Sequence, residues 1–426
     1  MVALLRALYS ALGTLLAPLL TLLYRERAKI GKEDPFRLSE RAGLATLTRP
    51  NGTLVWFHAA SVGEAQSVLT LIRALLAAAP ALHVLITTGT VTSAALVARQ
   101  NIAHLHHQFV PMDTPAAVRR FLDHWQPNLA LWVESEFWPQ LMWQTQARRI
   151  PMLLINARIS EKTFRNWKRA GGLIRSLLNG FTAIYAGSDL DAERLRALGA
   201  HNIHSIGNLK YDAPPLPVDT KLAEELAKQT AGRPILVVAS THAPEEISIA
   251  QTHLLAATRI PNLLTILVPR HANRGNGIAT DLRAHGIALA QRSKGETITP
   301  ETQLYLADTM GELGTFYAAA DLVFMGGSLI PHGGQNPLEA ARFTKPILSG
   351  PHTQNFAAII AQFQATSAIE VVADAETLAN AIVRQMGDPA ARQRMAQYAH
   401  DLVEQHRGAS THILQHSIAL LAGEAP

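Results

Sequence analysis

The sequence contains no cysteine. This absence excludes disulfide bonds, thiolate metal sites and cysteine nucleophiles, and it is typical of proteins of a reducing compartment. Charged residues make up only 17% of the chain and aromatic residues 6%, whereas 48% is hydrophobic, so we expect a globular protein. The basic residues are scattered and form no stripe interleaved with aromatic residues, and we therefore expect no nucleic-acid partner.

Length and net charge narrow the expectation further. At 426 residues, the chain can form two domains of ordinary size, each with its own hydrophobic core. The formal net charge of +5 indicates an acidic partner, such as an anionic lipid surface or a substrate that carries phosphate.

A long uncharged segment lies near the N-terminus. Residues 7–24 contain no charged side chain, and a basic cluster follows between positions 25 and 32. Such a segment barely spans a bilayer as a helix, and its basic flank would keep the following chain in the cytoplasm. A helix lying in the membrane interface is the alternative. We expect residues 1–24 to form a membrane anchor that contributes little to the core.

Short runs of valine, isoleucine and leucine alternate with helical patterns along the rest of the chain, as in parallel α/β sheets. A first set of strands is predicted over residues 53–58, 83–87, 108–110, 129–133, 152–155 and 183–185. A second set is predicted over residues 235–239, 264–268, 304–306, 322–325, 346–348 and 369–372.

Every pattern breaks at the proline-rich residues 211–217, where we place a linker. The sequence thus predicts two doubly wound α/β domains, residues 25–212 and 213–426, with a last helix able to pack back on the first domain. Such folds bind ligands at the carboxyl ends of their strands, here in a cleft between the domains.

The segment 325–340 carries the most chemical information. A predicted strand runs into Gly326-Gly327, a second glycine pair follows at Gly333-Gly334, and a helix is expected to open at Asn336-Pro337. Glycines let the backbone approach a ligand closely, and the exposed N–H groups of a helix start attract phosphate. Glu339 could accept hydrogen bonds from ribose hydroxyls. The alternative is a plain helix cap, with Asn336 as N-cap.

Further motifs stand at strand-to-helix turns or before the linker. They cover residues 61–64 (Ser-Val-Gly-Glu), 134–139 (Glu-Ser-Glu-Phe-Trp-Pro), 207–212 (Gly-Asn-Leu-Lys-Tyr-Asp), 268–271 (Val-Pro-Arg-His) and 309–313 (Thr-Met-Gly-Glu-Leu). Two of them, Ser-x-x-Glu and Thr-x-x-Glu, also fit the capping-box pattern. A guanidinium such as that of the Pro-Arg-His motif suits bidentate phosphate binding.

Together these motifs resemble the 3-deoxy-D-manno-octulosonic acid (Kdo) transferases, membrane-anchored glycosyltransferases of lipopolysaccharide inner-core synthesis. The similarity runs from the N-terminal anchor to residues 336–340 and 350–353, and it departs at Gln140 and Gln335, where the family would have Asn and His. The resemblance implies two Rossmann-like domains of the GT-B type. It also implies CMP-Kdo as the donor and lipid IVA, the lipid A precursor, as the acceptor. The location implied is the inner membrane, with the catalytic domains on the cytoplasmic face.

The same resemblance assigns roles to individual residues. It implies Glu64 as the general base of an inverting transfer, with Glu134 and Lys210 stabilising the transition state. The residues implied in CMP binding are Pro269, Arg270, Met310, Gly311, Glu312, Asn336, Pro337, Leu338 and Glu339. No metal or other cofactor is expected. Asp189 and Asp191 mimic an Asp-x-Asp metal motif, but acidic residues at a helix start explain them better.

Two other interpretations of the sequence stay open. One is a GT-B glycosyltransferase that uses a UDP-sugar, and the other is a membrane-tethered nucleotide-binding protein without catalysis. The identity of the nucleotide that protects against thermal unfolding separates the first alternative, and release of product from a labelled sugar nucleotide separates the second.

Overall fold

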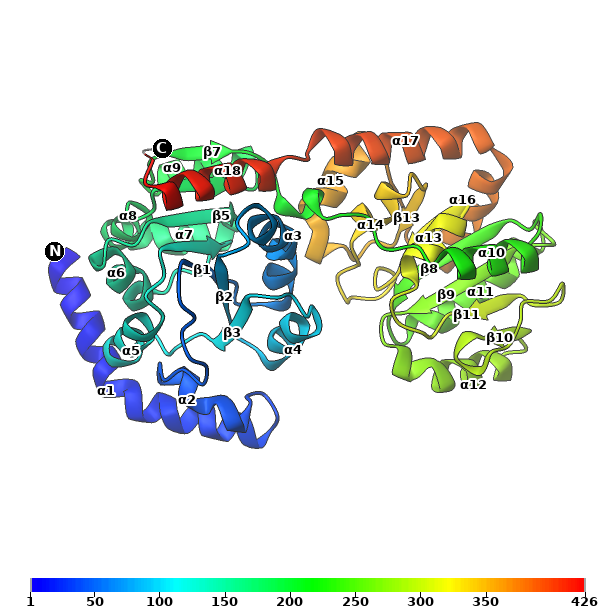
Figure 1. Ribbon diagram of the computed structural model, residues 1–426. Helices are drawn as coiled ribbons and strands as arrows, with labels where there is room; N and C mark the ends of the chain where they lie inside the picture. The colour runs from blue at the N-terminus through cyan, green and yellow to red at the C-terminus, as the bar shows by residue number, and fades with distance from the viewer. Residues whose placement is uncertain (1, 425–426) are drawn as a thin grey trace. The chain divides into compact units, whose positions relative to one another are not determined.

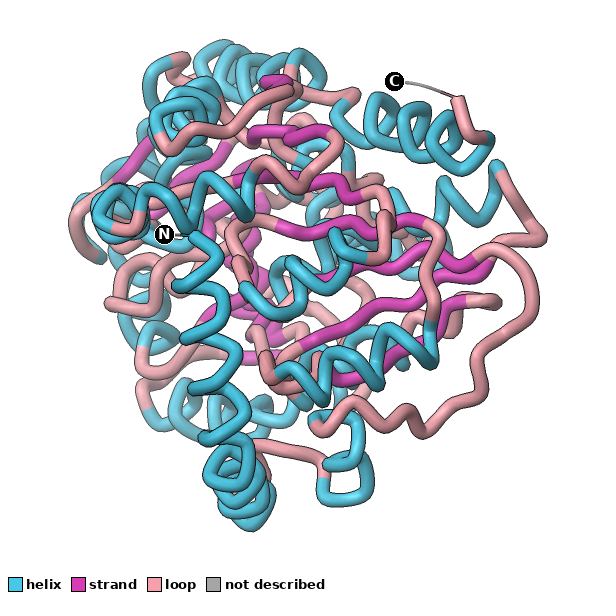
Figure 2. The backbone as a smooth tube through the Cα atoms, turned by 90° about the vertical axis from the view of Figure 1, so that its left-hand side faces the viewer, coloured by secondary structure: helices cyan, strands magenta, loops and turns pink. Residues whose placement is uncertain are grey.

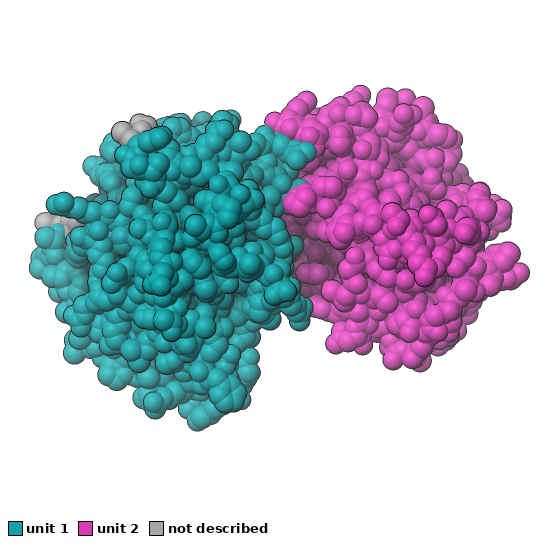
Figure 3. Space-filling model, in the orientation of Figure 1, with its two compact units in different colours: residues 1–213, 406–426 teal, residues 214–405 magenta. Residues whose placement is uncertain are grey.

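The computed structural model describes residues 2–424 and divides the chain into two compact units. Unit 1 contains residues 1–213 together with residues 406–426, and unit 2 contains residues 214–405 (Figure 3). The break between the units lies in the proline-rich segment 211–217. Residues 406–426 belong to unit 1, so the predicted range 213–426 does not describe unit 2 as a whole.

Unit 1 is built on a parallel sheet of seven strands in the order β3-β2-β1-β4-β5-β6-β7 (Figure 1). The strands are β1 (Leu54–His58), β2 (His83–Thr88), β3 (Leu105–Phe109), β4 (Leu129–Val133), β5 (Met152–Ala157), β6 (Ala183–Ala186) and β7 (Ile203–Ser205). Successive side chains of a strand point to opposite faces, so Trp56 joins the core on one face and Phe57 the core on the other. Helices cover both faces, which explains why the central strands are continuous apolar runs.

The helices of unit 1 are α1 (Val2–Lys29), α2 (Leu38–Arg41), α3 (Val62–Ala78), α4 (Val91–Arg99), α5 (Pro115–Trp125), α6 (Pro139–Ala147), α7 (Glu161–Arg169), α8 (Gly171–Leu178), α9 (Asp189–Ala197) and α18 (Ala409–Ala422). The last of them, α18, packs against α3. Asp212 accepts hydrogen bonds from the N–H groups of Gly408 and Ser410, each at 2.6 Å, and so holds the start of α18. The Asp212 side chain therefore fixes the point at which the chain returns to unit 1.

Helix α1 runs along the outside of unit 1 (Figure 1, Figure 2). By length and composition, its residues Ala3–Lys29 could cross a membrane. One face of α1 nevertheless contacts the unit. The Tyr9 hydroxyl donates to Asp113 at 2.9 Å, the Tyr9 ring meets Trp143 edge-on, and Arg41 lies over the Tyr24 ring. The expectation that the N-terminal segment contributes little to the core is therefore too simple.

Unit 2 repeats the architecture with the strand order β10-β11-β9-β8-β12-β13-β14, all parallel. The strands are β8 (Ile235–Thr241), β9 (Leu264–Pro269), β10 (Leu289–Gln291), β11 (Leu304–Leu306), β12 (Leu322–Met325), β13 (Ile347–Ser349) and β14 (Glu370–Val371). The helices are α10 (Thr220–Gln229), α11 (Glu245–Ala257), α12 (Gly275–Ala284), α13 (Leu313–Ala319), α14 (Pro337–Arg342), α15 (Ala357–Ala365), α16 (Ala375–Gly387) and α17 (Pro389–Gln405).

The structure differs from the predicted strands at the edges of the sheets. Strands β7 and β10 were missed because each has only three residues and carries polar side chains. Strand β3 begins at Leu105, before the predicted start at residue 108. The predicted start was too late because two histidines in the strand weaken its apolar pattern. One of them, His106, lies 3.2 Å from the His83 ring of β2.

Candidate active site

Glu64 lies in the first turn of α3, directly after β1. Ser61 is the N-cap, and its hydroxyl donates to one Glu64 carboxylate oxygen at 2.8 Å. The other carboxylate oxygen accepts the N–H of Ala60 at 2.9 Å. The capping arrangement predicted from the sequence is thus present. It does not exclude a chemical role, because the carboxylate is held in one position by two donors.

Burial is the main reason why the pKa of Glu64 is raised to about 7. The negative charges of Glu134 and Glu136 raise this pKa further, whereas the hydrogen bonds from Ser61 and Ala60 lower it. The carboxylates of Glu134 and Glu136 therefore lie within electrostatic reach of Glu64, beyond the carboxyl ends of the neighbouring strands β1 and β4. A carboxylate with a pKa near neutrality can accept a proton at physiological pH.

Glu134 and Glu136 belong to the loop between β4 and α6. Glu134 has a left-handed backbone conformation with φ 58°, which costs a non-glycine residue roughly 1–3 kcal/mol and is frequent at functional sites. The Trp138 indole N–H donates to the Glu136 carboxylate at 2.9 Å. Helix α6 begins only at Pro139. Both glutamates therefore precede the helix and lie in the loop.

Asp113 connects the end of this loop to α1. Its carboxylate accepts the N–H groups of Gln140 at 3.1 Å and Leu141 at 2.8 Å, which caps α6, and it also accepts the Tyr9 hydroxyl. The Gln140 side chain donates to the Ser10 hydroxyl. Gln140 thus links the start of α6 to α1.

His58 is a residue of this region that the sequence analysis missed. It ends β1, is fully buried, and lies against the rings of Trp132 and Trp138. Burial lowers the pKa of His58 to about 3, so the ring is neutral. Its Nδ1 faces the Thr87 hydroxyl at 3.0 Å, and its Nε2 has no hydrogen-bond partner among the residues that the structure describes. A lone histidine at the end of an apolar strand was the available signal.

Lys210 lies in a single turn of 3-10 helix, Leu209–Asp212, that packs against α3. Asn208 caps this turn by accepting the Lys210 N–H at 2.9 Å. The turn is tied to the end of β5, because the side chain of Asn156 accepts the Leu209 N–H at 3.2 Å. Glu64 thus lies on α3, and the turn of Lys210 packs against α3. Glu134 follows the end of β4, the strand beside β1.

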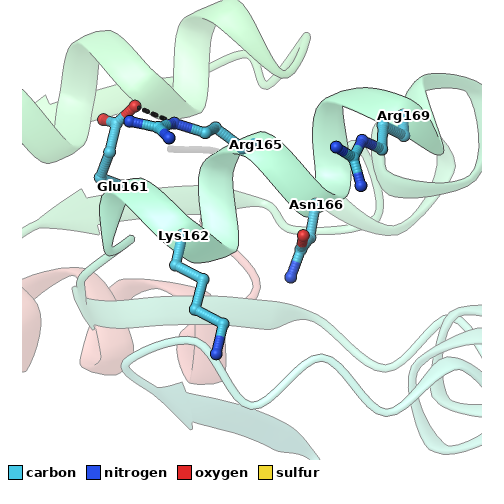
Figure 4. Close-up of a pocket in the computed structure, with 5 residues that line it drawn as sticks. All are labelled: Glu161, Lys162, Arg165, Asn166 and Arg169. Carbon is cyan, nitrogen blue, oxygen red and sulfur yellow. Dashed lines mark hydrogen bonds and ion pairs between the residues drawn. The ribbon is translucent and has the colours of Figure 1, made fainter.

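Helix α7 presents a basic face near the loop between β4 and α6. Phe164 and Trp167 pack inward against the core, and Trp167 meets Phe137 edge-on at 6.1 Å. On the exposed side, a shallow hollow is lined by Glu161, Lys162, Arg165, Asn166 and Arg169. Figure 4 shows Glu161 paired with Arg165, while Lys162 and Asn166 point to one side of the helix. The hollow thus carries a net positive charge.

In unit 2, Arg270 and Glu339 lie within electrostatic reach of each other. Arg270 directly follows β9, and its N–H donates to the Thr241 carbonyl of β8 at 3.0 Å. Glu339 stands in the first turn of α14, where Asn336 is the N-cap and Pro337 the first helical residue. Burial raises the pKa of Glu339, and the charges of Arg342 and Arg270 oppose this rise. The structure therefore brings together two of the predicted CMP-binding motifs.

The predicted Met-Gly-Glu motif offers mainly backbone to a ligand. Met310 and Gly311 are exposed, and Gly311 has φ 89°, a conformation that favours glycine. The Glu312 carboxylate pairs with Arg292 at 2.8 Å and also accepts the Thr309 hydroxyl. These contacts lower the pKa of Glu312. The carboxylate is thus engaged within the protein, whereas the preceding turn is accessible.

The first glycine pair has a different role from the one expected. The carboxylate of Glu245, at the start of α11, accepts the N–H groups of Gly327 at 2.6 Å, Ser328 at 3.1 Å and Leu329 at 3.0 Å. These N–H groups are therefore occupied by a buried carboxylate of the protein itself. Gly326 is required by packing, because a Cβ there would lie 2.8 Å from the Ala239 carbonyl oxygen. The prediction that this turn offers its backbone to a ligand is wrong.

A histidine cluster beside Arg270 was also missed. The rings of His242 and His332 stack with centroids 3.6 Å apart, and His271 meets His242 edge-on. The Gln335 side chain lies 3.0 Å from the His242 ring nitrogen and so joins this cluster. Burial and neighbouring positive charge lower the pKa of His242 to about 4.

Asp189 and Asp191 have structural partners. Asp191 accepts the Ile159 N–H at 2.8 Å and the hydroxyl of its N-cap Ser188 at 2.5 Å. Asp189 accepts the Ser205 hydroxyl at 2.6 Å, which links α9 to β7. Both carboxylates thus stabilise the start of a helix, in line with the interpretation favoured from the sequence.

Two known protein families match the chain, one in each unit. A profile described as 3-Deoxy-D-manno-octulosonic-acid transferase (kdotransferase) matches residues 36–213, and one described as Glycosyl transferases group 1 matches residues 289–402. A solved glycosyltransferase from Rickettsia africae has a TM-score of 0.54 at 10% identity, covering 87% of this chain and 98% of that chain, which shows the fold alone. The two parallel-sheet units are of the GT-B type.

Curated relatives cover nearly the whole chain. The 3-deoxy-D-manno-octulosonic acid transferase of Haemophilus influenzae is 32% identical, over 89% of this chain and 90% of that protein. The transferase of the same name from Bordetella pertussis is 34% identical, over 96% of this chain and 98% of that protein. With both its units matched, the chain is a glycosyltransferase that belongs to the 3-deoxy-D-manno-octulosonic acid transferase family.

Proposed function

We propose that this protein transfers Kdo from CMP-Kdo to lipid IVA with inversion at the anomeric carbon and releases CMP. The observation that carries the proposal is the carboxylate of Glu64. It is buried and held by two hydrogen bonds, and its pKa of about 7 suits a general base. Kdo is proposed as the transferred sugar because the chain belongs to this family.

In the proposed reaction, a hydroxyl oxygen of the acceptor attacks the anomeric carbon of Kdo. The bond from this carbon to the phosphate oxygen breaks, and CMP leaves with the electron pair. The hydroxyl proton passes to the Glu64 carboxylate. An inverting displacement needs the base and the leaving group on opposite faces of the sugar. Glu134 and Lys210 stabilise the developing charge at the sugar and at the phosphate.

Unit 2 holds CMP in this proposal. The guanidinium of Arg270 binds the phosphate and the Glu339 carboxylate accepts hydrogen bonds from the ribose hydroxyls. The accessible turn at Met310 and Gly311, with its neighbour Glu312, contacts the nucleobase of CMP. The remaining contacts come from the end of β9 and the start of α14, at Pro269, Asn336, Pro337 and Leu338.

The acceptor side of the proposal rests on unit 1. The basic hollow on α7 suits an acceptor that carries phosphate, and it belongs to a helix that packs against the loop of Glu134. Helix α1, apolar enough to enter a membrane, would anchor the enzyme at the inner membrane with both units on the cytoplasmic face.

Mass spectrometry of lipid IVA incubated with CMP-Kdo and the full-length protein tests the function. An increase in acceptor mass by one or more Kdo residues, together with release of CMP, is the expected result. Thermal unfolding in the presence of CMP or UDP is the companion measurement. Protection by UDP alone, with no change in acceptor mass, would contradict the proposal in favour of a UDP-sugar enzyme.

A further inference from the structure

An apolar groove runs between α1 and the rest of unit 1. Leu12, Leu16 and Leu20 of α1 form one wall, and Met112 and Trp138 contribute to the other. The groove has a volume of about 260 Å³. It belongs to neither the carboxylate cluster nor the basic hollow on α7, and the proposed reaction does not account for it.

Two of the polar side chains along the groove, Tyr9 and Asp113, are already engaged with each other. Tyr9 and Asp113 line it, but the Tyr9 hydroxyl donates to the Asp113 carboxylate, whose oxygens also accept two N–H groups of α6. The bond between Tyr9 and Asp113 also ties α1 to the rest of unit 1. At Gly13 a Cβ would make only ordinary contacts, 3.6 Å from the Asp113 carbonyl oxygen, so α1 lies close to unit 1 there without requiring glycine. The groove thus presents mainly apolar side chains to its occupant, together with the hydroxyl-bearing residues Tyr24 and Thr114.

Trp138 links the groove to the loop that carries Glu134 and Glu136. Trp138 lines the groove and donates its indole N–H to Glu136, whose charge acts on the pKa of Glu64. Trp138 and Glu136 thus connect the groove to the surroundings of Glu64. The groove residues of α1 extend from Tyr9 to Tyr24, which is about 22 Å of helix.

We infer that this groove binds one acyl chain of the lipid acceptor while the acceptor hydroxyl lies at Glu64. This inference rests on the proposed function. An acyl chain is linear and wholly apolar, and it spans one leaflet, about 15 Å, which is less than the length of the groove. Binding one chain would lift the acceptor sugar out of the headgroup layer and orient it towards the base. A chain of the bulk membrane lipid is the competing occupant, which the test distinguishes.

The test compares Leu16→Trp with Leu15→Trp in the full-length protein. Leu16 lines the groove, whereas its neighbour Leu15 is 77% exposed and does not. Both variants add the same indole to the same helix, so their effects on membrane binding should match. Initial rates are measured with CMP-Kdo and detergent-dispersed lipid IVA, and with the acyl-free glucosamine disaccharide bisphosphate as acceptor.

We expect Leu16→Trp to raise KM for lipid IVA by about tenfold or more relative to Leu15→Trp, since excluding even two methylene groups changes affinity by roughly that factor. KM for the acyl-free acceptor and KM for CMP-Kdo should be equal in the two variants. Equal KM values for lipid IVA would overturn the inference. A rise that appears for the acyl-free acceptor as well would also overturn it, because the substitution would then act on the site and not on the chain.

A second measurement does not depend on the stability of the variant. A photoreactive benzoylphenylalanine at position 16, but not at position 15, should crosslink to lipid IVA in detergent and be competed by unlabelled lipid IVA. Competition by an ordinary phospholipid to the same extent would assign the groove to bulk lipid and overturn the inference. Failure of the proposed function would look different, because the wild-type protein would then transfer Kdo to neither acceptor.

Discussion

Ser61 and Glu64 bind each other reciprocally at the first turn of α3. The Glu64 N–H donates to the Ser61 hydroxyl oxygen at 3.3 Å, and the Ser61 hydroxyl donates to the Glu64 carboxylate at 2.8 Å. The pair caps the helix and, in the same contact, fixes the orientation of the carboxylate and lowers its pKa against the larger effect of burial. One local motif thus provides both structure and the proposed base.

Glu64→Gln should abolish transfer while CMP binding is unchanged. The amide keeps the volume and can still accept the Ala60 N–H, but it cannot take up the hydroxyl proton. Turnover with lipid IVA and calorimetric titration with CMP check this prediction. Glu224→Gln is the control, because Glu224 is exposed on α10 of unit 2 and belongs to no part of the proposed site. Turnover of the Glu64→Gln variant near the wild-type level would leave Glu64 as a cap only.

The pH dependence of Glu64 has a defined sign. If the base must be deprotonated, kcat/KM should rise with pH through about 7. Ser61→Ala removes a hydrogen bond that favours the charged form, so the midpoint should move to higher pH, and loss of the cap should cost about 1 kcal/mol of stability. Rate profiles over the neutral pH range and thermal unfolding check both. An unmoved midpoint in Ser61→Ala would assign the titration to another group.

The same pKa shift affects stability. Because the folded pKa of Glu64 is raised above its ordinary value of 4.5, the folded state binds more protons than the unfolded state between pH 4.5 and about 7. Stability is therefore lost as pH rises through this window. Above the window, Glu64→Gln should be more stable than the wild type, by roughly 1–3 kcal/mol, and below it this advantage should vanish. Denaturant unfolding on both sides of the window measures the difference.

Arg270→Ala and Glu339→Ala should each weaken CMP binding by about 1.5–3 kcal/mol, the range of charge-assisted hydrogen bonds. The reason is loss of the phosphate contact in the first variant and of the ribose contact in the second. Arg283→Ala is the control, since Arg283 of unit 2 forms a surface pair with Glu296. Calorimetric titration is the measurement, and an unchanged CMP affinity in both variants would exclude this nucleotide site.

The parts of the fold predicted from sequence are those with local signals. The central strands, the break near residues 211–217 and the helix caps at Ser61 and Asn336 all lie in short stretches of characteristic composition. In contrast, Glu245 and Gly327 are 82 positions apart, so their hydrogen bond has no local pattern. The stacking of His242 on His332 was missed for the same reason.

For the candidate site, sequence motifs name individual residues such as Glu64 but not their arrangement. The electrostatic coupling of Glu64 to Glu136 depends on how two strands align side by side in the sheet. The docking of α1 was missed because an apolar run has the composition of a membrane segment whichever of its faces is covered. Polar residues within that run, such as Tyr9 and Tyr24, were the available signal of a partner in the fold.

Removal of residues 1–24 should release the protein from membranes and leave both parallel sheets folded. The deletion removes the Tyr9 contacts with Asp113 and Trp143, so we expect unit 1 to lose about 1–2 kcal/mol of stability but not its fold. Tyr9→Phe keeps the ring contact and loses only the hydrogen bond, and it should cost about 1 kcal/mol with membrane binding intact. Denaturant unfolding of both variants checks these values.

The truncated enzyme should still transfer Kdo to detergent-dispersed acceptor, with a raised KM, and should slow further on acceptor embedded in vesicles. Residual attachment to anionic vesicles should persist at low salt, because each basic residue near such a surface contributes about 1 kcal/mol. Flotation with anionic vesicles in low and high salt, run beside both activity assays, separates anchoring from catalysis. If the truncated chain misfolds completely, α1 is an obligatory part of unit 1, and its role as a separable anchor must be abandoned.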